Sequence, residues 1–149
     1  MSTSVTVRHN FETGHRLPNL GGKCTNLHGH SWWAEVTIAA PGIGDVVVEY
    51  GVLKKALRGW IDTHLDHGLM LGGDDPLAAI LPDFGKVYVF GSTPESDGLA
   101  WPTVENVAYL IAEASSRLLT GIDREPGTHV ASVTVHETHV NAATWTADA

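Results

Sequence analysis

The chain has 149 residues, 43% of them hydrophobic and 17% charged, and carries a net charge of −8 at pH 7. These values are typical of one folded domain with its own hydrophobic core, so we expect a single domain over residues 1–149. Nine lysines and arginines are too few for nucleic-acid binding, and no apolar run approaches the ~20 residues of a membrane span. One cysteine cannot form an intrachain disulfide, which fits a reducing compartment. We therefore expect a cytoplasmic protein that binds neither nucleic acid nor a membrane.

Alternation of apolar and polar residues predicts two strands in the first part of the chain. Residues 4–15, SVTVRHNFETGH, alternate, and residues 31–40, SWWAEVTIAA, resume the alternation. Between them, HRLPNLGGKCTN has no period and contains proline and glycine. We expect residues 15–26 to form a loop that joins the two strands.

Two amphipathic helices are predicted further along the chain. Residues 50–65 and 102–121 both place apolar residues at helical spacing, and Thr103 is the expected N-cap of the second helix. Residues 86–90 form a candidate short strand between loops rich in glycine, proline and aspartate. Residues 128–149 alternate again and are expected to form two last strands.

The order strand, strand, helix, helix, strand, strand predicts an α+β fold. We expect a four-stranded antiparallel sheet with both helices on one face. Such a sheet has open edges, and open edges can pair with other copies of the chain, so we expect a homo-oligomer.

His28 and His30 are separated by one residue, and side chains two apart on a strand project to the same side. His15 ends the preceding strand, and the loop can bring it alongside this pair. Three neutral imidazoles suit zinc and leave a fourth position open, which is the catalytic pattern. The alternative is an ordinary turn with surface histidines.

Cys24 lies four residues before His28, in a glycine-containing loop beside Lys23. A thiol close to a cation has its thiolate favoured, which a nucleophile or general base needs. Two alternatives remain: Cys24 is a fourth ligand that closes a structural zinc site, or it is a buried structural cysteine.

Carboxylates in two further short motifs are candidates for chemistry. Asp66 and His67 follow the first predicted helix and can form an acid/base relay, although a polar pair at a helix end is the common alternative. Glu137, in VHET at the end of an apolar strand, can accept two hydrogen bonds from the amino-pyrimidine edge of a guanine or pterin ring. Its alternative is an exposed glutamate at a strand end.

The motifs FETGHRLP, KCTNLHGHS, LDHGLML, PTVEN and HET, in this order around two predicted helices, resemble the family of 6-pyruvoyl- and 6-carboxy-tetrahydropterin synthases. The resemblance extends from Phe11 to about Trp145. It implies the tunnelling fold, in which subunits assemble into barrels with active sites between subunits.

The resemblance also implies roles for individual residues. His15, His28 and His30 match the zinc ligands, Cys24 matches the catalytic cysteine, and Asp66 and His67 match the acid/base pair. Glu137 matches the carboxylate that anchors the pterin, with Thr103 and Thr138 near it. Arg16 and Lys23, which lie beside the expected ligands, are candidates for phosphate contact.

The substrate implied by the resemblance is 7,8-dihydroneopterin triphosphate. The pyruvoyl branch eliminates triphosphate, and the carboxy branch also cleaves the side chain and releases acetaldehyde on the way to 7-deazaguanines such as queuosine. Three residues separate Cys24 from His28, which is similar to the bacterial carboxy type and favours that branch. A pyruvoyl synthase or a non-catalytic pterin- or zinc-binding homologue is the alternative. The segment 74–101 is longer than in compact members of the family.

Overall fold

Two long strands form the centre of the sheet in the computed structural model, which describes residues 1–42 and 44–148. Strands β1 (Ser2–His15) and β2 (His28–Pro41) run antiparallel, in register from Ser2 opposite Pro41 to His15 opposite His28. Strand β2 begins three residues earlier than the alternation predicts, so both of its histidines belong to the strand. Strands β5 (His129–His136) and β6 (Ala142–Thr146) extend the sheet beyond β2 as an antiparallel hairpin.

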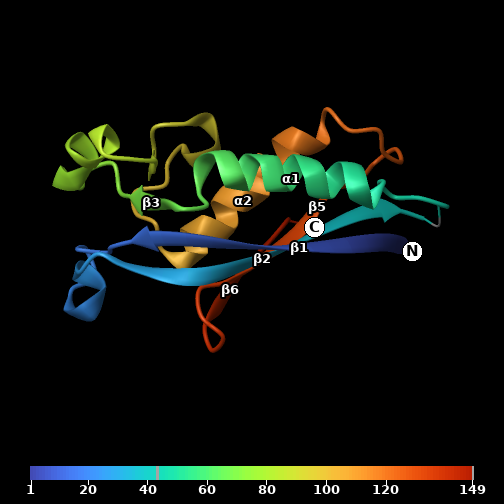
Figure 1. Ribbon diagram of the computed structural model, residues 1–149. Helices are drawn as coiled ribbons and strands as arrows, with labels where there is room; N and C mark the ends of the chain where they lie inside the picture. The colour runs from blue at the N-terminus through green and yellow to red at the C-terminus, as the bar shows by residue number, and fades with distance from the viewer. Residues whose placement is uncertain (43, 149) are drawn as a thin grey trace.

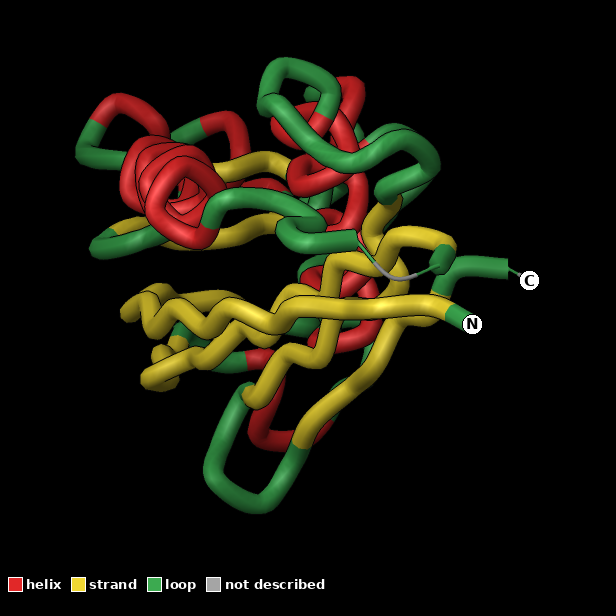
Figure 2. The backbone as a smooth tube through the Cα atoms, turned by 90° about the vertical axis from the view of Figure 1, so that its right-hand side faces the viewer, coloured by secondary structure: helices red, strands yellow, loops and turns green. Residues whose placement is uncertain are grey.

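Two helices cover one face of this sheet (Figure 1). Helix α1 (Tyr50–His64) is capped by the Glu49 carboxylate, which accepts hydrogen bonds from the first-turn N–H groups. Helix α2 (Val104–Leu119) begins as predicted at Thr103, whose hydroxyl accepts from the N–H of Asn106. Figure 2 shows α1 nearly end-on, with the long strands beneath it.

The sheet has six strands rather than the expected four, in the order β4-β3-β1-β2-β5-β6. Strand β3 (Gly68–Leu71) runs parallel to the end of β1, and β4 (Val87–Val89) runs parallel to β3. Residues 86–90 were expected to contain a strand, and β4 lies within them. Strand β3 was not predicted, because it is too short to show an alternation. The four long strands are antiparallel as predicted, and the two short parallel strands make the sheet mixed.

The loops contain several short 3-10 helices. They are η1 (Gly22–Thr25), η2 (Pro76–Ala79), η3 (Leu81–Asp83) and η4 (Pro94–Ser96). Helix η1 carries Cys24, and the other three lie in the long segment between β3 and α2. The segment 72–101 is therefore ordered around three helical turns and β4.

One hydrophobic core lies between the helices and the sheet. Its side chains come from alternate positions of β1, β2 and β5 and from the inner stripes of α1 and α2, with Phe11, Trp32, Leu57 and Leu110 among them. Among the described residues, no helix is both long and apolar enough to cross a bilayer. The core leaves the opposite face of the sheet free for polar side chains.

Candidate active site

Three histidines meet where β1 ends and β2 begins. The register places His15 opposite His28, and His30 opposite Thr13, on the same side of the sheet. The ring centroids of these histidines lie 4.8 to 5.4 Å apart. The loop between the strands therefore brings His15 to the HGH pair, as the sequence predicts.

Backbone carbonyls fix the orientation of two of these rings. Nδ1 of His15 lies 2.8 Å from the carbonyl oxygen of Pro102, and Nδ1 of His28 lies 2.7 Å from that of Asn26. A carbonyl oxygen only accepts, so each Nδ1 carries the proton and each neutral ring keeps its lone pair on Nε2. This is the arrangement by which a metal-binding histidine is oriented through its second nitrogen.

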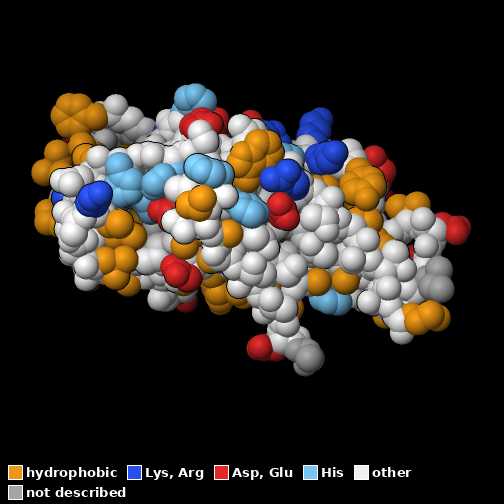
Figure 3. All heavy atoms as spheres, turned by 90° about the horizontal axis from the view of Figure 1, so that it is seen from below, with side chains coloured by type: hydrophobic (Ala, Val, Ile, Leu, Met, Phe, Trp, Pro, Cys, Tyr) orange, Lys and Arg blue, Asp and Glu red, His pale blue; other side chains and the backbone are white. Residues whose placement is uncertain are grey.

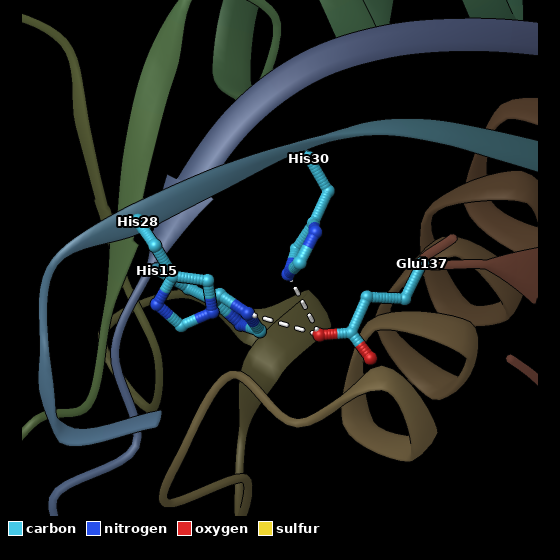
Figure 4. Close-up of side chains that lie close together, drawn as sticks. All are labelled: His15, His28, His30 and Glu137. Carbon is cyan, nitrogen blue, oxygen red and sulfur yellow. Dashed lines mark ion pairs between the residues drawn. The ribbon is translucent and has the colours of Figure 1, made fainter. Parts of the chain in front are cut away.

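Glu137, just after β5, completes the cluster. Its Oε1 atom lies 3.2 Å from Nε2 of His15 and 3.1 Å from Nε2 of His30, and Figure 4 shows the carboxylate and the imidazoles turned toward one another. Within the described residues, neither Nε2 makes a hydrogen bond of good geometry. In His15 this Nε2 is a lone pair that faces a carboxylate oxygen, so both acceptors point toward a place that a positively charged group can occupy.

Burial keeps His15 and His30 available as ligands. His15 is 0% exposed, and burial, as the largest cause, lowers the pKa of His15 and of His30 below the ordinary 6.5, although Glu137 offsets part of the effect. Neutral imidazole is the form that binds a metal. Protonation of the rings is therefore a poorer way to satisfy Glu137 than a bound cation.

The donor set fits zinc. The candidate ligand atoms of His15, His28, His30 and Glu137 all lie within 4.8 Å of one another. In a tetrahedral zinc site with bonds of ~2 Å, ligand atoms lie about 3.3 Å apart, so a group of this size can surround one ion. The group does not include Cys24.

A pocket of about 570 Å³ opens beside this cluster on the helix-free face of the sheet. Its lining residues are Arg8, His30, Ser31, Trp33, His136, Glu137, Thr138 and His139. Figure 3 views this face and shows several histidines gathered on it. The guanidinium of Arg8 lies 4.7 Å from the ring centre of Trp33, which leaves an aromatic and a cationic group beside the cluster.

Cys24 is half-buried in η1. Its backbone carbonyl accepts a hydrogen bond from the N–H of Leu17 at 2.6 Å, which ties η1 to the end of β1. Cys24 therefore belongs to the loop that connects two of the histidine-bearing strand ends.

Asp66 and His67 form the hydrogen-bonded pair that their spacing suggests, with Nδ1 of His67 2.7 Å from Oδ2 of Asp66. The Glu12 N–H donates to Asp66, and the Glu12 carbonyl accepts from the His67 N–H. Burial opposes ionisation of Asp66, but the hydrogen bonds from Glu12 and His67 outweigh it and lower the pKa of Asp66 below its usual 3.8. His67 has φ of 57°, a conformation that is rare outside glycine and is often found at functional sites.

The pair does not join the histidine cluster within one chain. The His67 side chain is 80% exposed, and within the described residues no hydrogen bond links either member to Cys24 or to the candidate ligands. His67 thus combines an unusual backbone conformation with an exposed side chain, and this side chain is accessible to a partner outside its own chain.

The remaining expected site residues have structural contacts in the single chain. Thr103 caps α2, and the Thr138 hydroxyl accepts from the N–H groups of Val140 and Asn141 in the β5–β6 turn. Arg16 is bound through two nitrogens to Asp75, whereas Lys23, the other expected phosphate contact, is exposed. Sequence reasoning missed Asp75, and the DDP motif alone contains no signal for its partner.

Comparison with known proteins places these motifs in a family. Residues 4–148 match the family described as 6-pyruvoyl tetrahydropterin synthase. A 6-carboxy-5,6,7,8-tetrahydropterin synthase of Rickettsia bellii is 31% identical over 122 residues, which cover 78% of this chain and 88% of that protein. The protein of the same name from Aquifex aeolicus is 31% identical over 105 residues, covering 59% and 64% of the two chains.

Solved structures share the fold. An uncharacterized protein of Wolinella succinogenes superposes with a TM-score of 0.75 at 22% identity, covering 99% of both chains. The 6-pyruvoyl tetrahydropterin synthase of Caenorhabditis elegans superposes with a TM-score of 0.66 at 24% identity, covering 99% of this chain and 97% of that one.

Proposed function

Since the chain belongs to the 6-pyruvoyl tetrahydropterin synthase family and has its tunnelling fold, we propose that it is a zinc-dependent 6-carboxytetrahydropterin synthase. It would convert 7,8-dihydroneopterin triphosphate to 6-carboxytetrahydropterin with release of acetaldehyde and triphosphate. The proposal takes residues 1–149 as one cytoplasmic domain that serves 7-deazaguanine (queuosine) biosynthesis. The single core and the relatives named 6-carboxy-5,6,7,8-tetrahydropterin synthase support it.

The observation that carries the metal part of the proposal is the convergence of His15, His28 and His30, whose candidate ligand atoms lie within 4.8 Å of one another. A lone pair fixed by the Pro102 carbonyl faces a carboxylate oxygen at 3.2 Å, inside a group of three histidines. His15, His28 and His30 would hold zinc through Nε2. Bound zinc would make the hydroxyls of the substrate side chain, and the carbons beside them, more acidic.

The chain's own residues would then handle the protons. Cys24, as a thiolate, would remove a proton from the substrate side chain. Asp66 would keep His67 oriented and would stabilise its charged form while the imidazole donates or accepts the complementary proton. Glu137, with Thr103 and Thr138 close by, would accept hydrogen bonds from the N–H groups of the amino-pyrimidine edge.

An assembly of several copies would unite these groups. Strand β3 covers only Thr13–His15 at the outer edge of β1, and the outer edge of β6 has no neighbouring strand among the described residues. These two edges can pair between copies, so that one chain supplies Cys24 and the histidines while a neighbour supplies Asp66 and His67. The 80% exposure of His67 supports this arrangement.

The experiment is incubation of the purified zinc-loaded protein with 7,8-dihydroneopterin triphosphate and identification of the products by mass. We expect 6-carboxytetrahydropterin and acetaldehyde, and we expect no turnover by Cys24→Ala. A pyruvoyl product would establish the second candidate, which the family match supports, and would overturn the carboxy assignment. Absence of any product would mean that the chain is a non-catalytic pterin- or zinc-binding protein. Turnover by Cys24→Ala at the wild-type rate would show that the thiol has no part in the mechanism.

A further inference from the structure

Arg16 and Asp75, 59 positions apart in the sequence, form a two-point ion pair. Nε of Arg16 donates to Oδ2 of Asp75 at 2.7 Å, and Nη2 donates to Oδ1 at 2.5 Å. The Asp75 side chain is 0% exposed, and its Oδ1 also accepts from the N–H of Leu77 at 2.9 Å. Two parallel bonds fix both the position and the orientation of a guanidinium group, so the pair limits how far Arg16 can move.

The neighbours of Arg16 are the two halves of the candidate active site. His15, immediately before it, belongs to the candidate metal cluster. Leu17, immediately after it, donates its N–H to the Cys24 carbonyl and thereby holds η1. A shift of Arg16 would therefore move a metal ligand and the cysteine loop together.

The segment that carries Asp75 contacts His15 by a second route. The Asp75 N–H donates to the Gly72 carbonyl, and Gly72 packs so closely on Trp101 that a Cβ atom there would lie 2.3 Å from Cε3 of the indole. Pro102 follows Trp101, and its carbonyl accepts the hydrogen bond from Nδ1 of His15. The long segment between β3 and α2 thus supports His15 through its ring and through the next residue in the chain.

We propose that Arg16 and Asp75 are positioning residues that hold His15 and the Cys24 loop in register with each other. This inference rests on the proposed function for the metal-binding role of His15 and the reactive role of Cys24. It gives the segment between β3 and α2 a role at the active site, which is to supply the buried carboxylate of Asp75 and the carbonyl of Pro102 behind His15. Neither residue belongs to the candidate metal cluster, so the pair would act on it through His15 and Leu17.

The test compares Asp75→Asn with Asp74→Asn in the full chain. Asp74 is the exposed neighbour, so its substitution makes the same change in charge without affecting Arg16. We expect Asp75→Asn to weaken zinc affinity by about 10- to 100-fold, the range observed when a residue that orients a metal ligand is lost. Competition with a chromophoric chelator measures this affinity. We also expect iodoacetamide to alkylate Cys24 several-fold faster, because Arg16 and Leu17 then hold η1 less firmly. Asp74→Asn should match the wild type in both measurements.

Arg16→Lys is the second variant, because it keeps a cation opposite the buried carboxylate and removes the two-point contact. The inference is overturned if Asp75→Asn or Arg16→Lys loses thermal stability while zinc affinity and the alkylation rate both stay within about twofold of the control. That result would make the pair a structural ion pair only. Failure of the proposed function would show in the wild type, as no zinc bound or no product, and the alkylation rates would still decide whether the pair positions Cys24.

Discussion

His15, the last residue of β1, lies directly opposite His28, the first residue of β2, and the two rings are 4.8 Å apart. Loss of a residue that hydrogen-bonds to a metal ligand lowers metal affinity by about 10- to 100-fold. We predict that His28→Ala lowers zinc affinity by more than this, because it removes a ligand atom itself. Zinc per chain and chelator competition measure the change. His129→Ala is the control, because His129 is exposed at the start of β5 and should leave zinc binding intact. Equal zinc affinity in the two variants would contradict the cluster.

Asp66 is held ionised by two hydrogen bonds, from Glu12 and from His67. We predict that Asp66→Asn lowers kcat by about 10²- to 10⁴-fold, the usual contribution of an acid/base group, while zinc content is unchanged. Steady-state kinetics and metal analysis of the same preparation test both parts. Asp62→Asn, an exposed substitution on α1, should keep the wild-type kcat. A large loss of zinc from Asp66→Asn would place the carboxylate in the metal site instead.

Separation of Cys24 from Asp66 and His67 within one chain predicts complementation between subunits. Cys24→Ala and Asp66→Asn should each be inactive, but a mixture that is dissociated and reassembled should regain activity. If each site takes Cys24 from one copy and Asp66 from another, random assembly of equal amounts gives about a quarter of the wild-type activity. Activity that stays at the level of the separate variants would mean that each chain builds its site alone.

Glu137 can be tested for two roles, metal ligand and substrate anchor, because its carboxylate lies beside the histidines and also lines the adjoining pocket. We predict that Glu137→Gln keeps its zinc and raises KM by about 10- to 100-fold, the effect of losing a charge-assisted hydrogen bond to the substrate. Zinc affinity and KM are measured on the same variant. A fall in zinc affinity as large as that of His28→Ala would instead make Glu137 a fourth ligand.

His9 makes the metal-free protein sensitive to acid. Burial, followed by the charges of Arg58 and Lys54, lowers the pKa of His9, and Asp62 opposes this only weakly. The unfolded chain, with a histidine pKa of about 6.5, therefore binds more protons as the pH falls below that value. The free energy of unfolding should decrease from about pH 6.5 downward until the folded-state pKa is reached, by at most about 1.4 kcal/mol per pH unit for one histidine.

His9→Gln should flatten this dependence, whereas the exposed substitution His129→Gln should leave it unchanged. Urea unfolding of the metal-free proteins at several values between pH 7.5 and 5.5 measures the slopes. The pKa values of His15 and His30 are lowered in the same direction, so a residual slope is expected in His9→Gln. Parallel curves for His9→Gln and the wild type would show that His9 is not the source.

Local sequence patterns were sufficient to predict the strands and helices in which apolar residues recur at a regular spacing. The long strands and both helices follow the alternation and the helical spacing, and the cap at Thr103 is where its residue type predicts. The histidine cluster could equally be predicted, because His28 and His30 are two apart on one strand and β1 and β2 are adjacent strands joined by one loop. Such features depend on residues close in sequence or on a single strand pairing.

Contacts between distant segments were decided only by the tertiary structure. The short strands β3 and β4 carry too few residues for a period, and they form because β1 offers a free edge to pair with. Arg16 meets Asp75, and His15 meets Pro102, across 59 and 87 positions of sequence. The period of apolar residues shows which face of a strand or helix a side chain occupies, but not which segment packs against that face. The sequence therefore determined the candidate ligands, and the folded chain determined which residues hold them in place.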